Sequence, residues 1–291
     1  MRLVAARLRR VDLTGARFQT VDLTGAVFRD VDFSGAQLRG VLVREADVSG
    51  EIISLTVNGV DVVPLVEAEL DRRDPERPRL LRPTDPAGFR EAWEINERRW
   101  AGTVERARRL PPEALHESVD GEWSFIETLR HLAFATDSWV SRAILGDPSP
   151  WHPLELPWDE MPDTPGVPRN RSARPSLEEA LALRHDRMAR VQQLLGELTD
   201  ESLAAQTTPV KGPGWPEPRS YPLRECLLTV LNEEYHHRLF AERDLATLEA
   251  SRSDTEGTVD LPVSAPGRAV PSVIPPGSAP RPGCGSRPSS T

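Results

Sequence analysis

Residues 232–245 read NEEYHHRLFAERDL and decide how the last helix-forming segment of this chain must pack. Glu233 and His237 are four residues apart, so on a helix they lie one turn apart on the same face. The residues that continue this 3–4 spacing are mostly apolar: Cys226, Val230, Phe240 and Asp244. A carboxylate and an imidazole on a face directed at a core are costly unless they are paired or bind a metal. The stretch therefore predicts a helix that brings polar groups into a helical domain.

Three earlier segments also have the spacing of amphipathic helices. The first follows Asp85, a residue able to cap a helix, and has proline at its first helical position. The second and third begin with Ser-x-x-Glu capping boxes at Ser124 and Ser176. Four such segments joined by two long loops predict an all-α, up-down four-helix bundle over residues 88–250.

His131 supplies a candidate third partner for Glu233 and His237, because facing helices of a bundle assemble metal sites from inward side chains. Two histidines and one carboxylate leave coordination positions open and suit a divalent metal such as zinc, nickel or iron. Spacing alone also fits an alternative, since Glu-x3-His pairs are common as exposed ion pairs on helices. We therefore hypothesise a metal site formed by His131, Glu233 and His237.

The sequence gives less specific predictions for the residues near these three candidate ligands. His236 is the alternative ligand, but its helix face is more polar, so we expect it at the surface. Glu234 is expected to orient His131 or a metal-bound water. Asp137, one and a half turns after His131, either supports the metal ligands or is exposed, and we expect it to be exposed. Cys226 is expected to be a buried core residue.

Residues 11–50 repeat every five residues, with Ala or Val at the first position and Leu, Phe or Val at the third. Neither the helical nor the strand period fits this pattern. It resembles the pentapeptide-repeat family, which implies a short right-handed quadrilateral β-helix with an internal ladder of third-position side chains. Eight repeats give about two coils, which is marginal for a solenoid that stands alone. We expect a cap or interaction module rather than the DNA mimicry of some family members.

Residues 123–132 (WSFIETLRHL) and 232–238 (NEEYHHR) carry a second resemblance, which covers residues 88–249. They resemble the DinB-like superfamily of four-helix-bundle metalloenzymes. That superfamily places one ligating histidine on its second helix and a His-x3-His pair on its last, with arginine after the second of the pair. His131 and His237 match ligand positions, whereas Glu233 stands where the pattern usually has histidine. Glutamate is a competent zinc ligand.

The resemblance implies a metal-dependent enzyme that uses a low-molecular-weight thiol, such as mycothiol, as the nucleophile. The reaction would be S-transfer or isomerisation of an electrophilic small molecule, since a metal lowers the pKa of a bound thiol. Two alternatives remain open at this point. The same site would serve a metal-dependent hydrolase, or the domain would be a non-catalytic scaffold with a degenerate metal site and a partner-docking repeat module. The sequence identifies no catalytic or cofactor-binding residue beyond the three candidate ligands.

Composition divides the chain into four parts. We expect a pentapeptide-repeat module over residues 1–70, a charged, proline-rich linker over 71–87, the bundle over 88–250 and a disordered Pro/Ser/Gly tail over 251–291. Near the end of the first part, Asn58-Gly59 between two short β-prone runs predicts a hairpin.

The net charge and the hydropathy of the sequence argue against some classes of binding partner. The net charge is −9, and residues 51–250 hold 24 basic against 36 acidic residues, or −12. Such an acidic region argues against nucleic acid, and no apolar run approaches the roughly 20 residues that cross a membrane. The first residues lack a signal peptide, so a cytoplasmic location is expected. The expected partner is a small-molecule substrate, with a protein partner or a second copy of the chain as further candidates.

Overall fold

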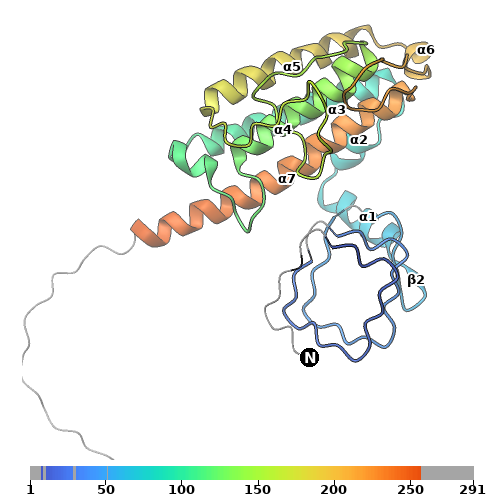
Figure 1. Cartoon of the computed structure of the whole chain (residues 1–291), viewed down its shortest axis with the longest axis vertical. Coiled ribbons are helices and arrows are strands. Elements are labelled where there is room, and N and C mark those ends of the chain that lie inside the picture. The colour runs from blue at the N-terminus through green and yellow to red at the C-terminus, as the bar shows by residue number, and fades with distance from the viewer. Residues whose placement is uncertain (1–7, 9–10, 29–30, 51, 257–291) are drawn as a thin grey trace, which may run out of the picture. The chain divides into compact units, whose positions relative to one another are not determined.

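The computed structural model describes residues 8, 11–28, 31–50 and 52–256. The chain forms two compact units, Met1–Leu55 and Thr56–Thr291, which are drawn together in Figure 1 and are described in turn. No helix in the described ranges is long and apolar enough to cross a membrane.

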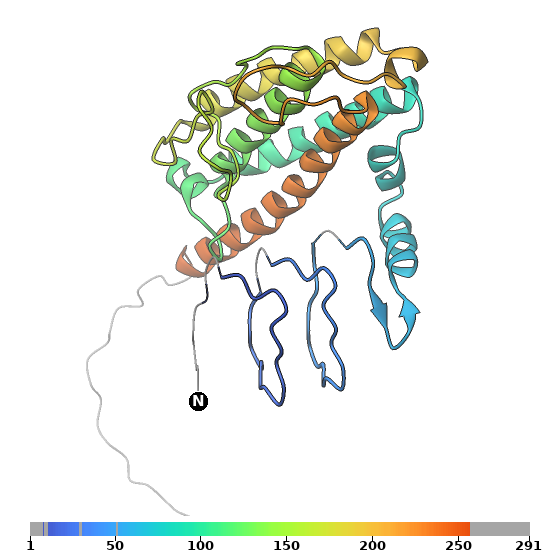
Figure 2. The same ribbon diagram turned by 45° about the vertical axis from the view of Figure 1, so that its right-hand side comes forward.

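The first unit is a succession of regular turns. In the turn Leu13–Ala16, the N–H of Ala16 donates to the Leu13 carbonyl at 2.9 Å, and the same bond recurs ten and twenty residues later. The fifth position of each described repeat has a positive φ: Gly15, Thr20, Gly25, Gly35, Gly40, Glu45 and Gly50. A left-handed residue every fifth position turns the backbone at a fixed interval. This explains the successive coils visible in Figure 2.

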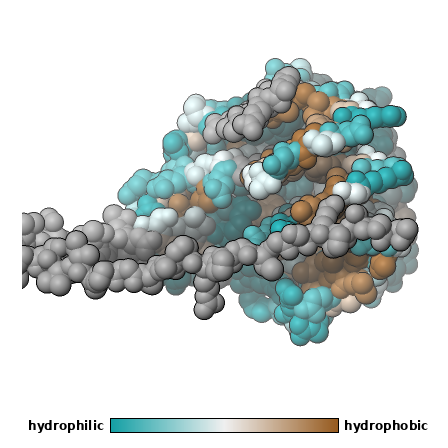
Figure 3. All heavy atoms as spheres, turned by 90° about the horizontal axis from the view of Figure 1, so that it is seen from below, coloured by the Kyte–Doolittle hydropathy of each residue, from teal (hydrophilic) through white to brown (hydrophobic). Residues whose placement is uncertain are grey.

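The apolar positions of this unit are not enclosed. Leu13 has the least exposed third-position side chain and is still 47% exposed. Phe28 and Phe33 make an edge contact at 5.4 Å between ring centroids, but both are about half exposed. Figure 3, which looks at the molecule from below, shows brown apolar residues at the surface among teal ones. The internal ladder therefore stays a prediction, as does the β-helix, because two coils offer each side chain few neighbours to cover it.

A hairpin opens the second unit. β1 (Thr56–Val57) pairs antiparallel with β2 (Val60–Asp61) around Asn58 and Gly59, whose φ angles are 51° and 83°. Both central residues of a type I′ turn require positive φ, which Asn-Gly readily adopts. The predicted hairpin is present. It belongs to the same compact unit as the helices that follow it.

One short helix lies mostly within the residues assigned to the repeat module (1–70), and a second lies within the segment expected to be a linker (71–87). They are α1 (Val63–Arg73) and α2 (Arg77–Leu81). Arg77 is 7% exposed and pairs with Glu67 and Asp71 of α1 at 2.8 and 2.7 Å. Leu80 is 1% exposed and belongs to a cluster with Ile95 and Tyr235. Residues 71–87 thus differ from a linker, because one apolar side chain and one paired arginine bury α2 against the domain.

Four long helical stretches form the rest of the unit (Figure 1). The elements are α3 (Pro86–Ala107), the short 3-10 helix η1 (Pro112–His116), α4 (Phe125–Thr136), its π-helical continuation η2 (Asp137–Ile144), α5 (Leu177–Glu197), the short α6 (Asp200–Leu203) and α7 (Leu223–Glu256). α4 packs against α5 and α7, while α3 packs against α7 and α5. One core cluster joins all four: Trp100, Leu129, Leu132, Leu181 and Leu245. The prediction of an all-α fold for this part of the chain is confirmed.

The predicted helix starts are also confirmed. The Asp85 side chain accepts a hydrogen bond from the N–H of Gly88 at 2.8 Å, and proline follows it. Ser124 and Ser176 both form complete capping boxes with the glutamates three residues later. These caps satisfy backbone N–H groups that a helix start leaves without partners, so they set where α4 and α5 begin.

The last helix differs from expectation at both its core face and its end. Its buried face is wider than the predicted stripe: Cys226 and Val230 are buried as expected, and the residues one position further along are buried too, namely Leu227, Leu231, Glu234, Ala241 and Leu245. Phe240, expected in the core, is 38% exposed. Glu233 and His237 therefore lie at the edge of the core rather than in its middle. α7 continues to Glu256, beyond the tail boundary predicted at 251, and residues 257–291 of that tail lie outside the described residues.

Candidate metal centre

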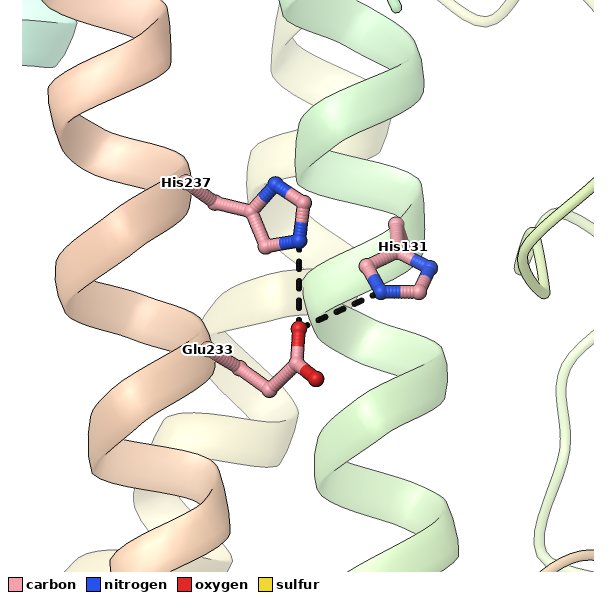
Figure 4. A group of neighbouring side chains, drawn as sticks. All are labelled: His131, Glu233 and His237. Atoms are coloured by element: carbon pink, nitrogen blue, oxygen red, sulfur yellow. Dashed lines mark ion pairs between the residues drawn. The ribbon is translucent and has the colours of Figure 1, made fainter. Parts of the chain in front are cut away.

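Two helices bring the candidate ligands together. His131 lies in the middle of α4, and Glu233 and His237 lie one turn apart on α7 (Figure 4). Glu233 Oε2 is 3.4 Å from His131 Nε2 and 3.1 Å from His237 Nε2. Among the described residues these three form a group of possible metal ligands whose donor atoms all lie within 4.8 Å of one another. The expectation that they converge agrees with the structure.

The distances suit a small divalent cation. Ligands at about 2.0–2.2 Å from a tetrahedral zinc ion lie about 3.3–3.6 Å apart. The two distances from Glu233 Oε2 to the histidine nitrogens, 3.4 and 3.1 Å, are close to that value. Two imidazoles and one carboxylate are donors that zinc, nickel and iron accept. The donor set and its spacing therefore fit a bound metal.

The hydrogen bond made by the other ring nitrogen of His131 determines which nitrogen carries the proton. His131 Nδ1 is 3.0 Å from the carbonyl oxygen of Leu156, and a carbonyl oxygen can only accept. Nδ1 must therefore carry the proton, so a neutral His131 presents the lone pair of Nε2 to Glu233. A lone pair facing a carboxylate oxygen at 3.4 Å is repulsive unless a proton or a cation lies between them. This is the tautomer that a metal-binding histidine needs.

The burial of His131 makes a proton between its Nε2 and the Glu233 carboxylate unfavourable. His131 is 6% exposed, and removal from water lowers the pKa of its imidazole, although Glu233 opposes that effect. Burial by itself would raise the pKa of the Glu233 carboxyl, but the neighbouring imidazoles of His131 and His237 hold that pKa below its ordinary value. At neutral pH the centre consists of an ionised carboxylate beside a histidine that resists protonation. That combination favours a cation.

An aromatic side chain covers the two histidines. Trp123, immediately before the cap of α4, stacks on His237 with ring centroids 5.7 Å apart and an interplanar angle of 11°. Its ring centroid is 4.4 Å from that of His131, and its indole N–H donates to Asp159 at 3.2 Å. The side chain of Glu233 is 32% exposed, so the centre reaches solvent beside the carboxylate. Sequence reasoning gave Trp123 no role, although it is one residue before a capping box.

The structure also tests the expectations for the polar residues near the three candidate ligands. His236 lies outside the three-residue group, and its ring contacts are with Tyr235 and Phe240. Glu234 was expected to orient His131 or a metal-bound water, but its carboxylate is instead paired with Arg184. Glu234 is 1% exposed and forms a bidentate ion pair with Arg184 of α5, because it lies on the true core face of α7.

The expectation for Asp137 is wrong, because this residue is fully buried rather than exposed. It pairs with Arg187 of α5 at 2.7 Å and accepts a hydrogen bond from Ser141 at 2.7 Å. Arg184 and Arg187 continue the spacing of the apolar stripe of α5, which is the pattern that could have revealed both pairs. Cys226 is fully buried as predicted, and burial raises the pKa of its thiol to about 11.

Comparison with known families identifies both parts of the chain. The model of the DinB superfamily matches residues 95–241, a range that contains all three candidate ligands. The model of pentapeptide repeats matches residues 6–44 in 8 copies. No curated protein and no solved structure matches the chain.

Proposed function

The chain belongs to the DinB superfamily, and on that premise we propose that its helical domain is a metal-dependent enzyme. His131, Glu233 and His237 would hold one divalent cation, with zinc, nickel and iron as the candidates. When bound, the metal would lower the pKa of a coordinated thiol and so supply a nucleophile at neutral pH. The proposed reaction is transfer of that sulfur to an electrophilic small molecule, or an isomerisation that begins in the same way.

The observation that carries the metal proposal is the orientation of His131. Its Nδ1–H is committed to the Leu156 carbonyl, so Nε2 faces Glu233 Oε2 at 3.4 Å with its lone pair. Two acceptors held this close repel each other, and the burial of His131 limits how far water can screen that repulsion. A cation between them removes the conflict.

The described protein offers no sulfur nucleophile of its own at this centre. Cys226 is the free cysteine of the described ranges; it is fully buried in a separate cluster with Ala143 and Tyr221. The pKa of its thiol, raised to about 11, keeps it protonated at neutral pH. In the proposed reaction the sulfur would therefore be supplied by a small thiol from solution, such as mycothiol, rather than by Cys226.

The residues around the centre would shape that reaction. Trp123 closes one side by stacking on His237, and the ring centroid of Phe134 lies 6.1 Å from that of His131. Glu233 leaves the remaining side open to solvent, so thiol and electrophile would enter there. Aromatic walls exclude water from the reacting sulfur and favour an apolar electrophile.

The test is a rate measurement on metal-loaded protein. Purified chain loaded with zinc, nickel or iron is mixed with mycothiol or glutathione and 1-chloro-2,4-dinitrobenzene, and thioether formation is followed by absorbance. We expect a rate above the uncatalysed reaction that is lost in Glu233→Ala and retained in His236→Ala, the matched control on the next face of α7.

Each other result selects a different function. Consumption of an ester or amide substrate with no dependence on thiol would identify a metal-dependent hydrolase instead. A wild-type protein that binds no metal and accelerates neither reaction would leave the scaffold interpretation, in which the domain and the repeat module only dock a partner.

A further inference from the structure

A short stretch of the long connection between η2 and α5 is fastened to α4 beside the metal centre. Arg130 donates from Nε to the Leu154 carbonyl at 2.6 Å, and its own carbonyl accepts from the N–H of Leu156 at 3.3 Å. The Leu156 carbonyl then accepts from His131 Nδ1 at 3.0 Å. Residues 154–156 therefore contact two successive residues of α4, one of which is a candidate ligand.

The middle residue of this stretch carries a buried carboxyl group. Glu155 is fully buried, and its Oε1 accepts from Arg187 Nη2 of α5 at 3.0 Å. The same Arg187 pairs with Asp137 of η2 at 2.7 Å, and Asp137 is also fully buried. One side chain from the loop is thus joined to two different helices in the interior of the domain.

The balance of charge in this cluster indicates its protonation. Two buried carboxyl groups share Arg187, while the second oxygen of Glu155, Oε2, has no donor among the described groups. Burial and a hydrogen bond with Asp137 raise the pKa of Glu155 to about 10. A protonated Glu155 donates to Asp137 and leaves one negative and one positive charge among the buried groups. The remaining charged partners, Asp186 beside Arg187 and Arg190 beside Asp137, are 56% and 39% exposed.

We propose that Glu155 is a positioning residue for the metal centre: its buried carboxyl group anchors the loop so that the Leu156 carbonyl stays against His131. The anchor would fix which nitrogen of His131 carries the proton and where the imidazole points. Removing the hydrogen-bond partner of a ligating histidine typically weakens metal binding by about 10- to 100-fold. The consequence for metal binding rests on the proposed function, whereas the consequence for the His131 tautomer does not.

Two substitutions separate anchoring from simple packing. Glu155→Gln keeps the shape and hydrogen-bonding groups of a protonated carboxyl, since its carbonyl oxygen accepts from Arg187 and its amide donates to Asp137. Glu155→Ala removes the anchor. Asp85→Ala is the control, because it deletes the N-cap of α3 and destabilises the domain without touching the loop.

The two readouts are the tautomer of His131, from ¹⁵N NMR of the full-length metal-free protein at pH 8, and the zinc affinity, from competition with a chromophoric chelator. We expect wild type, Glu155→Gln and Asp85→Ala to show the Nδ1–H tautomer and zinc affinities within about threefold of one another. Glu155→Ala should mix the tautomers and weaken zinc binding by about 10- to 100-fold.

An unchanged tautomer and unchanged zinc affinity in folded Glu155→Ala would overturn the proposal. If circular dichroism shows that Glu155→Ala does not fold, Arg187→Gln removes the same anchor from the α5 side and has the same two expectations. If wild type binds no zinc, the proposed function fails while the tautomer comparison still decides the role of Glu155.

Discussion

Replacing Glu155 by glutamine should change how the stability of the helical domain depends on pH. Glu155 is fully buried next to Asp137, and its pKa is raised from 4.5 to about 10. Between those two values the folded chain holds a proton that the unfolded chain has released. Because the folded pKa is the higher one, the stabilisation is complete below about pH 4.5 and is lost as the pH rises toward about 10.

The expected magnitude follows from proton linkage. One proton retained only in the folded state lowers the free energy of unfolding by about 1.4 kcal/mol for each unit of rising pH. Glutamine cannot titrate, so Glu155→Gln lacks this dependence. The free energy of unfolding of the variant minus that of wild type should therefore grow by about 2.7 kcal/mol between pH 6 and pH 8.

Urea unfolding at pH 6, 7 and 8, followed by tryptophan fluorescence and far-ultraviolet circular dichroism, measures this difference. Taking the difference at each pH cancels the contributions of groups common to both proteins. A variant that is destabilised by the same amount at every pH would show that Glu155 is ionised in the folded chain. The protonated cluster, and the charge balance inferred from it, would then be wrong.

Three further substitutions have defined outcomes. Gly214→Ala should lower the free energy of unfolding by about 2–4 kcal/mol in a urea titration, because a Cβ would lie 2.6 Å from Arg142 Cζ at a φ of +149°. Glu234→Gln should cost about 3–5 kcal/mol in the same assay, since it leaves the Arg184 charge buried without a counter-charge. Trp123→Phe should remove most of the fluorescence quenching caused by Co²⁺, because Trp123 stacks on the candidate ligand His237. Six of the 7 tryptophans remain in this variant, and undiminished quenching would place the metal elsewhere.

Sequence reasoning succeeded where the physics is local. Capping at Asp85, Ser124 and Ser176 depends on residues three positions apart, and the structure shows all three caps. The convergence of His131 with the Glu233–His237 pair could also be predicted, since one helical turn and a bundle suffice to bring them together.

The rest depends on contacts between distant segments. Asp137 was expected to be exposed because its partner, Arg187, lies 50 residues away on α5. Glu155 lies in a loop without periodicity, so nothing local indicates that its carboxyl is buried. The short helix α2 was interpreted as a linker because its charged residues form ion pairs that composition does not reveal, such as Arg77 with Glu67.

Binding of one divalent metal by His131, Glu233 and His237 is the property on which the proposed function depends. Isothermal titration of metal-free full-length protein with Zn²⁺, supported by elemental analysis after dialysis, measures it most directly. We predict one zinc per chain for wild type and for His236→Ala, and a loss of affinity of at least about 100-fold for His131→Ala, Glu233→Ala and His237→Ala. Glu233→His keeps three ligands and should bind zinc. Absence of zinc binding by wild type, or undiminished affinity in His131→Ala, would show that these three residues do not form a metal site.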